Sequence, residues 1–168
     1  MLDPVYQYRL EPARAAEAAR LAAMSRELVE SGLRPTWDAA RIGWHIRNPD
    51  SVVLAARAAT AVAGFAIMRY GDDSAHLNLL AVAPAHRRRG IARRLMAWLE
   101  GTALTAGTFI IGLELRESNT AGRAFYTALG YRERGYVAGY YQGVESAIRM
   151  ERDLREGRGA SPGTGAQR

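Results

Sequence analysis

The residues best suited to chemistry form a basic cluster in the middle of the chain. Five arginines stand close together there: Arg87, Arg88, Arg89, Arg93 and Arg94. An apolar run at residues 77–82 precedes them, and an amphipathic helical pattern begins at residue 91. The first turn of a helix offers N–H groups without intrahelical partners at the positive end of the helix dipole. Gly90 lets that backbone approach a ligand closely. The cluster therefore predicts a site for a phosphorylated ligand.

Two common phosphate-binding loops are excluded, because neither the motif G-x-x-x-x-G-K-[ST] nor the motif G-x-G-x-x-G occurs in the chain. The pattern Arg87-x-x-Gly90-x-Ala92 instead resembles the coenzyme A loop, Q/R-x-x-G-x-G/A, of the GNAT family of N-acetyltransferases. Downstream, residues 113–131 read LELRESNTAGRAFYTALGY. This stretch is similar to the signature of the branch that acetylates protein N-terminal amines, typified by the ribosomal-protein-alanine N-acetyltransferases. The resemblance runs from about residue 52 to residue 153.

The resemblance implies that acetyl-CoA is the cofactor. It implies that the backbone of residues 80–82 bonds the pantetheine and the acetyl carbonyl, with the Val82 N–H as oxyanion donor. It also implies that the arginine loop holds the pyrophosphate and that the Asn119 side chain contacts the coenzyme. The full set of coenzyme-binding residues implied in this way is Leu80, Ala81, Val82, Arg87, Arg88, Arg89, Gly90, Ile91, Ala92, Arg93, Asn119 and Tyr126.

Amide formation from a thioester needs one group that removes a proton from the amine and another that protonates the departing thiolate. Glu114 and Tyr126 have the right chemistry. Strand alternation places Glu114 on the face opposite Leu113, next to Gly112, which leaves room beside the carboxylate. From spacing alone, Glu114 also fits a solvated charge paired with Arg116, and Tyr126 fits a packing aromatic. The resemblance implies that Glu114 is the general base, directly or through water, and Tyr126 the general acid.

Acceptor recognition is expected where the resemblance fades. The residues nominated for the acceptor wall are Arg34, Trp37, Trp44, Arg47, Tyr140 and Tyr141. Trp37 and Trp44 lie seven residues apart on one helical face, so both core packing and substrate contact remain open. The connection at residues 31–37 is longer than is usual in the alanine-acetylating branch, and Arg34 on it favours an acidic acceptor.

Two of the histidines, His76 and His86, could suggest a proton relay, but their places at a strand start and on the loop rim favour solvated side chains. We interpret His76 and His86 as solvated, and His45 as a packing residue between apolar neighbours. Ser118 is expected to cap the helix that follows it. No His, Asp and Glu residues have a convincing ligand spacing, so no metal is predicted. The chain has no cysteine, which excludes disulfides and a cysteine-borne acyl intermediate.

Length and charge bound the function class. A chain of 168 residues with 48% hydrophobic content suits one domain with a substantial core. The net charge of +6 comes from 23 basic and 17 acidic residues, and the arginine loop supplies much of the local excess, which favours coenzyme phosphates over nucleic acid. The first ten residues lack the basic and apolar regions of a signal peptide, and no window approaches the ~20 apolar residues of a membrane span. We therefore expect a cytoplasmic enzyme without a membrane or nucleic-acid partner, as monomer or homodimer.

Periodicity and turn residues predict the order β-α-α-β-β-β-α-β-α-β-β. The expected strands are residues 5–10, 52–58, 61–70, 76–82, 108–116, 132–141 and 146–153. The expected helices are residues 12–30, 37–47 with Thr36 as its cap, one from residue 91 that closes at Gly101 or Gly107, and 119–129. In these last two helices, the inward residues are expected to be Ile91, Leu95, Trp98 and Leu99, then Ala121, Ala124, Phe125 and Ala128.

The fold class is α/β (α+β), a GNAT fold with a mixed twisted sheet of about seven strands and helices on both faces. The resemblance implies that its fourth and fifth strands splay apart. Residues 1–154 are expected to form a single domain, and residues 155–168, rich in Gly, Pro and Ser, a disordered tail.

The leading hypothesis is an acetyl-CoA-dependent N-acetyltransferase that acts on a primary amine by direct transfer, most simply the N-terminus of a protein or peptide. A small amine such as a polyamine, an amino acid or an aminoglycoside antibiotic is the alternative acceptor. A non-catalytic coenzyme-A-binding regulatory module also fits the loop. RNA binding through residues 87–94 is disfavoured, because the chain lacks further basic and aromatic stripes.

Overall fold

The computed structural model describes residues 7–156, and within them seven strands form one sheet in the order β1-β2-β3-β4-β5-β7-β6. The strands are β1 Tyr8–Pro12, β2 Ser51–Ala58, β3 Ala61–Tyr70, β4 Ser74–Val82, β5 Ile110–Arg116, β6 Arg132–Tyr141 and β7 Glu145–Asp153. The helices are α1 Ala18–Leu28, α2 Ala39–Arg47, α3 Ile91–Thr105 and α4 Thr120–Ala128, with short 3₁₀ turns η2 Ala15–Glu17 and η3 Pro84–His86. The predicted order of elements and the mixed sheet are confirmed.

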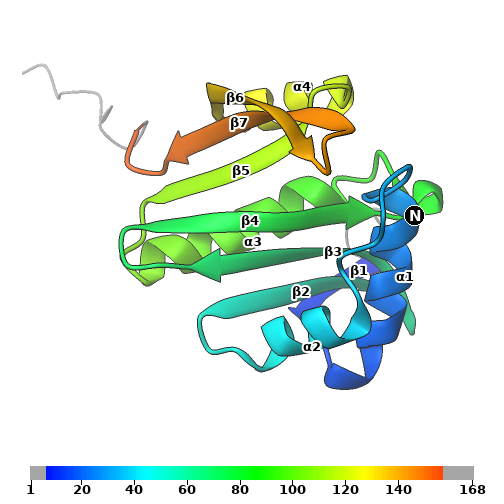
Figure 1. The fold of residues 1–168 in the computed structure, drawn as a ribbon. Helices are drawn as coiled ribbons and strands as arrows, with labels where there is room; N and C mark the ends of the chain where they lie inside the picture. The colour runs from blue at the N-terminus through cyan, green and yellow to red at the C-terminus, as the bar shows by residue number, and fades with distance from the viewer. Residues whose placement is uncertain (1–6, 157–168) are drawn as a thin grey trace, which may run out of the picture.

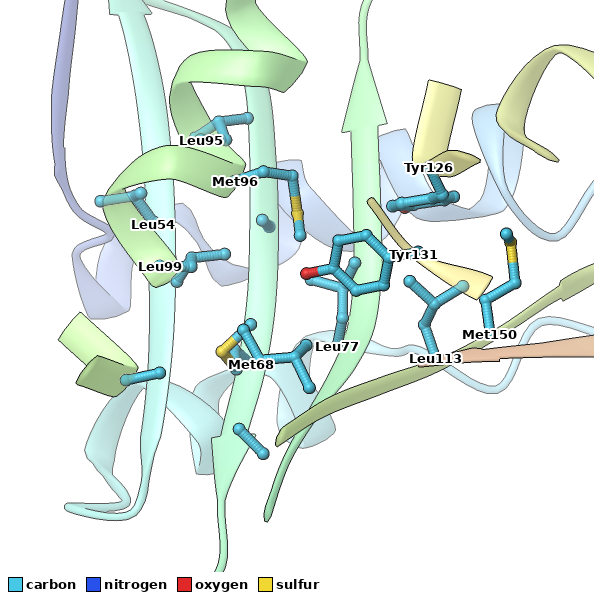
Figure 2. Close-up of a cluster of buried hydrophobic side chains, with 14 of the residues drawn as sticks. Leu54, Met68, Leu77, Leu95, Met96, Leu99, Leu113, Tyr126, Tyr131 and Met150 are labelled. Carbon is cyan, nitrogen blue, oxygen red and sulfur yellow. The ribbon is translucent and has the colours of Figure 1, made fainter. Parts of the chain in front are cut away.

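Helices cover both faces of the sheet, as predicted (Figure 1). One apolar cluster joins α1 and α2 to the sheet through residues such as Leu21, Ile42 and Phe65. The other lies beneath α3 and α4 and contains the side chains drawn in Figure 2, among them Met96 and Tyr131. Because the middle strands have both faces buried, the sheet forms a rigid platform for the residues at its edges.

The parallel pair β4 and β5 separates partway along its length. Ser74–Leu77 pairs with Ile110–Leu113, and the pairing ends there. A register shift in the β3–β4 ladder, where Ile67 faces Leu79 and Met68 faces Leu77, leaves Asn78 as a bulge at this point. A bulge bends its strand, and Figure 1 shows β5 diverging from β4 beyond it. The predicted splay of the fourth and fifth strands is confirmed.

The N-terminal helices differ from the expected boundaries. The helix expected at residues 12–30 begins only at Ala18, and α2 begins at Ala39. Thr36 is not the cap of α2, because the backbone N–H and hydroxyl of Thr36 donate to the buried Glu30 carboxylate at 2.6 and 2.8 Å. Asp38 caps the helix instead by accepting from the Arg41 N–H at 2.8 Å. The expected first strand begins at Val5, which lies outside the described residues.

Helix α3 buries Ile91, Leu95 and Leu99 as predicted, but the predictions for Trp98 and for the alanines of α4 are wrong. Trp98 is 37% exposed, and α3 packs through the smaller residues Leu95, Met96 and Leu99. Helix α3 runs through Gly101 and ends before Gly107. On α4, the three alanines expected inward are exposed. Tyr126 is buried in their place, because its bulky ring fills the space beneath this short helix. Asn119, and not Ser118, is the N-cap of α4, accepting from the Gly122 N–H at 2.9 Å.

The described residues contain no helix that is long and apolar enough to cross a membrane. Of the tail predicted at residues 155–168, the part beyond Glu156 lies outside the described residues. The single domain expected for residues 1–154 stays a prediction.

Candidate active site

A groove of about 760 Å³ opens where β4 and β5 diverge. Its lining includes the segment between α1 and α2, the two splayed strands, and the hairpin between β6 and β7. The predicted site residues that share this lining are Leu80, Ala81, Val82, Arg87, Glu114, Asn119, Tyr126, Trp37, Tyr140 and Tyr141. The fold therefore gathers in one place residues that lie more than a hundred positions apart in the sequence.

A second cavity of about 550 Å³ lies at the N-terminus of α3. The predicted residues that line it are Val82, Arg87, Arg88, Gly90, Ile91, Ala92 and Arg93. Val82 and Arg87 line both cavities, so the groove continues toward the helix terminus. Arg89 does not line either cavity, and its guanidinium donates to the Tyr8 hydroxyl at 3.2 Å instead.

The loop before α3 has the backbone geometry of an anion site. Gly90 is the N-cap at φ 75°, and Arg88 is also in the left-handed region at φ 61°. No side chain caps α3, so its first-turn N–H groups have no side-chain acceptor at this end. A Cβ added at Gly90 would meet no protein atom within 4 Å, which means that this backbone faces open space. With Arg88 and Arg93 alongside, the terminus suits a phosphate.

The Glu114 carboxylate lies between two basic side chains. Its Oε2 is 2.5 Å from Nε2 of His76, and its Oε1 accepts from Nε of Arg149 at 3.2 Å. The hydrogen bond from His76 holds the pKa of Glu114 below its ordinary value, with Arg149 acting in the same direction, and burial only partly opposes them. Glu114 is thus an ionised carboxylate at neutral pH. Arg116, the partner considered from spacing, pairs with Glu145 at 3.5 Å instead.

The sequence had suggested that His76 is a solvated side chain, but its ring contacts the Glu114 carboxylate. In the β4–β5 register it stands opposite Gly112, which has no side chain to separate His76 from Glu114. His86 also has a partner, because its Nδ1 is 2.9 Å from the Tyr8 hydroxyl. His45 is buried and contacts Ser51 at 2.9 Å, which agrees with its interpretation as a packing residue.

Tyr126 lies on the other side of the groove from Glu114. Glu114 projects from the sheet face opposite to buried Leu113 and Leu115, whereas Tyr126 belongs to the cluster that contains them. Figure 2 shows Tyr126 where α4 meets this cluster, and its ring centroid is 5.6 Å from that of Tyr131. Burial, helped by Tyr141, raises the pKa of the Tyr126 phenol well above its ordinary value. The hydroxyl therefore keeps its proton at neutral pH.

The acceptor-wall candidates divide into two groups. Trp37, Tyr140 and Tyr141 line the groove, and Trp37 is also part of the core, since it is only 8% exposed. Its outer ring face carries the Arg41 guanidinium at 3.7 Å. The groove lining does not include Arg34, Trp44 or Arg47. Trp44 is 45% exposed and contacts His45 and Arg69, while the Arg34 backbone is held by the Gln142 side chain at 2.8 and 2.9 Å.

Among the groove residues to which the sequence reasoning gave no role in the site are His76, Arg41 and Gln142. Only the strand register, which the sequence does not state, could have connected His76 with Glu114. Arg41 could have been found, because it lies four residues after Trp37, the spacing of neighbours on one face of the helix expected at residues 37–47. Within residues 7–156, no group of three or more His, Cys, Asp or Glu side chains could hold a metal ion.

The amino-acid sequence is similar to those of known N-acetyltransferases. A ribosomal protein bS18-alanine N-acetyltransferase of Salmonella typhimurium is 40% identical over 92 residues, which span 53% of this chain and 62% of that protein. N-alpha-acetyltransferase 20 of Dictyostelium discoideum is 40% identical over 80 residues, which span 47% of this chain and 46% of that protein. The chain thus matches less than two thirds of the length of either relative.

The fold is shared with solved structures. The crystal structure of the ribosomal-protein-S18-alanine N-acetyltransferase from Escherichia coli aligns with a TM-score of 0.77 at 22% identity, covering 96% of this chain and 99% of that one. Ard1 from Thermoplasma volcanium aligns with a TM-score of 0.78 at 21% identity, covering 88% and 98%. At such identities the likeness concerns the fold alone. The profile of the acetyltransferase (GNAT) family, however, matches residues 17–131, and the chain therefore belongs to the GNAT acetyltransferase family.

Proposed function

We propose that this protein is an acetyl-CoA-dependent N-acetyltransferase that transfers the acetyl group directly to the N-terminal amine of a protein or peptide. The observation that carries the proposal is a single groove with Glu114 on one side and Tyr126 on the other, continuous with an anion cavity at the N-terminus of α3. The names of the relatives support this acceptor, since they acetylate ribosomal protein alanine or α-amines. The cytoplasmic location and the oligomeric state stay predictions.

The coenzyme is proposed to lie along the splayed edge of β4. Beyond Leu77 this edge has no β5 partner, so an extended pantetheine arm can occupy the place of a strand. The backbone of Leu80–Val82 would bond its amides, and the pyrophosphate would lie at Gly90 between Arg88 and Arg93. We assign the oxyanion donor to the Val82 N–H.

The proposed chemistry uses the two sides of the groove. The neutral amine attacks the thioester carbonyl, its proton leaves on the Glu114 side, and the C–N bond forms as the C–S bond breaks. Tyr126 protonates the departing thiolate, a role supported by its place in the groove lining across from Glu114. Burial raises the pKa of its phenol, so the hydroxyl holds a proton at neutral pH. The chain contains no cysteine, so the transfer needs no acyl-cysteine intermediate.

Acceptor class is tested by comparing turnover on two panels, one of N-terminal peptides and one of polyamines, amino acids and aminoglycosides. We expect peptides to be the better substrates. Among them, an acidic second residue should be preferred to lysine, because Arg41 places a guanidinium on the groove wall, where the sequence had nominated Arg34. Mass spectrometry of the products identifies the acetylated nitrogen. Turnover confined to the small amines would instead make this protein a small-molecule acetyltransferase.

The anion site is tested by Gly90→Val, with Gly107→Val as the matched control. Both glycines have a positive φ, 75° and 78°, and both face open space, but they lie at opposite ends of α3. Each substitution strains the backbone to a similar extent. Only a side chain at residue 90 projects into the cavity, so Gly90→Val should weaken acetyl-CoA binding by at least about 10-fold. Calorimetric titration measures this, and equal affinities in the two variants would refute the loop assignment.

A further inference from the structure

We infer that His76 is the residue that accepts the proton from the acceptor amine, and that Glu114 is the residue that positions its ring. This inference rests on the proposed function and deepens it, because it replaces a general assignment to the Glu114 side with one atom, Nδ1 of His76. His76 and Glu114 both line the groove and lie on the neighbouring parallel strands β4 and β5. His76 Nε2 and Glu114 Oε2 are 2.5 Å apart.

The register explains why this pair forms at the narrow end of the groove. His76 is opposite Gly112, and the next pair, Leu77 with Leu113, is the last one in the β4–β5 ladder. Glu114 follows immediately, where the strands begin to separate. The imidazole can extend over the bare Gly112 backbone and reach the carboxylate two residues further along β5. The pair therefore lies at the point where β4 and β5 begin to separate.

Both oxygens of Glu114 already have partners. Oε1 accepts from Arg149, and Oε2 faces His76. The side chain of Glu114 is only 13% exposed, whereas that of His76 is 43% exposed. These contacts also hold the pKa of Glu114 below its ordinary value, and a carboxylate so stabilised is a poor acceptor for an amine proton. The imidazole is the basic group that an incoming amine can reach.

The tautomer follows from the same contacts. An ionised carboxylate only accepts hydrogen bonds, so Nε2 of His76 carries the hydrogen that points to Glu114. Neutral imidazole then has its lone pair on Nδ1. Within residues 7–156, Nδ1 of His76 has no hydrogen-bond partner. A carboxylate that fixes the tautomer and stabilises the imidazolium is the arrangement that activates histidine as a base in other enzymes.

The charged and titratable groups around the pair are consistent with this assignment. Glu114 is the carboxylate in contact with the ring, and Arg149 of β7 donates a hydrogen bond to the other oxygen of that carboxylate. Tyr140 of β6 is close enough to interact with both Glu114 and Arg149, and burial raises its pKa, so it remains neutral. On β3 the register neighbour of His76 is Arg69, whose guanidinium lies over the exposed ring of Trp44. His76 lines the groove, and its Nδ1 is thus left to the substrate.

The step balances without any further reactant. The amine nitrogen forms the C–N bond as its proton passes to Nδ1 of His76, and the resulting imidazolium keeps its Nε2–H on Glu114. The C–S bond breaks, and Tyr126 protonates the sulfur. Proton exchange with water then restores neutral His76 and protonated Tyr126.

The test compares wild type with His76→Gln and His76→Ala. We expect His76→Gln to lower kcat by about 10²-fold with little change in acetyl-CoA affinity, and to change the dependence of the rate on pH. Added imidazole should restore part of the rate of His76→Ala. A purely structural role would give neither the altered pH profile nor the rescue. Unchanged acetyl-CoA affinity in both variants establishes that they are folded.

Nitrogen NMR shifts provide a readout that does not depend on turnover. The chain has only three histidines, and the His76→Gln spectrum identifies the signals of His76. The neutral ring should carry its proton on Nε2, the nitrogen that faces Glu114. Wild-type kcat and pH profile in His76→Gln, or a neutral ring protonated on Nδ1, would overturn the inference while leaving the proposed function intact. A wild-type protein that acetylates no amine would overturn both.

Discussion

Replacing Glu114 with glutamine is expected to lower turnover at neutral pH by about 10²- to 10³-fold, the range in which a positioned acid–base group contributes. Glutamine keeps the size of the side chain but removes the charge that faces His76 and Arg149. Because the pKa of Glu114 is lowered, this charge is present throughout the neutral range, and its loss affects the rate at every such pH. Acetyl-CoA affinity should scarcely change, since the anion cavity is formed by other residues.

The pH dependence of Glu114→Gln gives a second comparison. Its rate should recover partly at high pH, where the amine loses its proton without assistance. If Glu114 acts through His76, the double variant with His76→Gln should be little slower than either single variant, because residues that act as a unit are not additive. Steady-state rates across pH for the three variants provide the measurement. Full activity of Glu114→Gln at all pH values would remove this carboxylate from the mechanism.

Replacing Tyr126 with phenylalanine is expected to slow the chemical step by about 10²-fold, because the thiolate must then leave without a positioned proton donor. The ring is 8% exposed and packs against Phe125 and Tyr131 at centroid distances of 5.1 and 5.6 Å. Phenylalanine preserves these contacts, so the melting temperature should move little. Single-turnover transfer measures the role of Tyr126 as a proton donor, and thermal unfolding of the same variant measures its role in core packing.

The matched control for Tyr126→Phe is Tyr131→Phe. The Tyr131 hydroxyl donates to Glu100 at 3.1 Å, and Tyr131 does not line the groove. Loss of that hydrogen bond should reduce stability and leave transfer intact. Undiminished transfer by the Tyr126 variant would leave Tyr126 as a core aromatic only.

The sequence predicted those parts of the site that depend on local pattern. The arginine loop precedes a helix that its own apolar periodicity defines, and Gly90, predicted to allow close approach of a ligand, is the N-cap of that helix. Alternation along one strand placed Glu114 on the face opposite Leu113. Each of these features involves neighbours within a few residues, and for that reason each was recognisable without the structure.

The parts that the sequence did not predict depend on contacts between distant segments. His76 and Glu114 are 38 residues apart, and only the parallel register of β4 and β5 brings them together. Thr36 has the side chain of a helix cap, but the buried Glu30 carboxylate binds its donors and Asp38 takes its place. Trp98 follows the apolar period of α3 yet remains partly exposed, because smaller residues fill the space beneath the helix. In each case a tertiary contact overrides a local preference.

The most direct test of the account is a single-turnover experiment with the wild-type protein, in which protein and acetyl-CoA in equal amounts are mixed with an N-terminal peptide and quenched at intervals. Free coenzyme A thiol, acetylated peptide and the mass of the intact protein are measured in each sample. Direct transfer in the groove predicts that thiol and acetylated α-amine appear at the same rate while the mass of the protein stays constant. Acetyl-CoA that binds but releases no thiol to any amine, or an acetyl group that appears first on the protein, would contradict it.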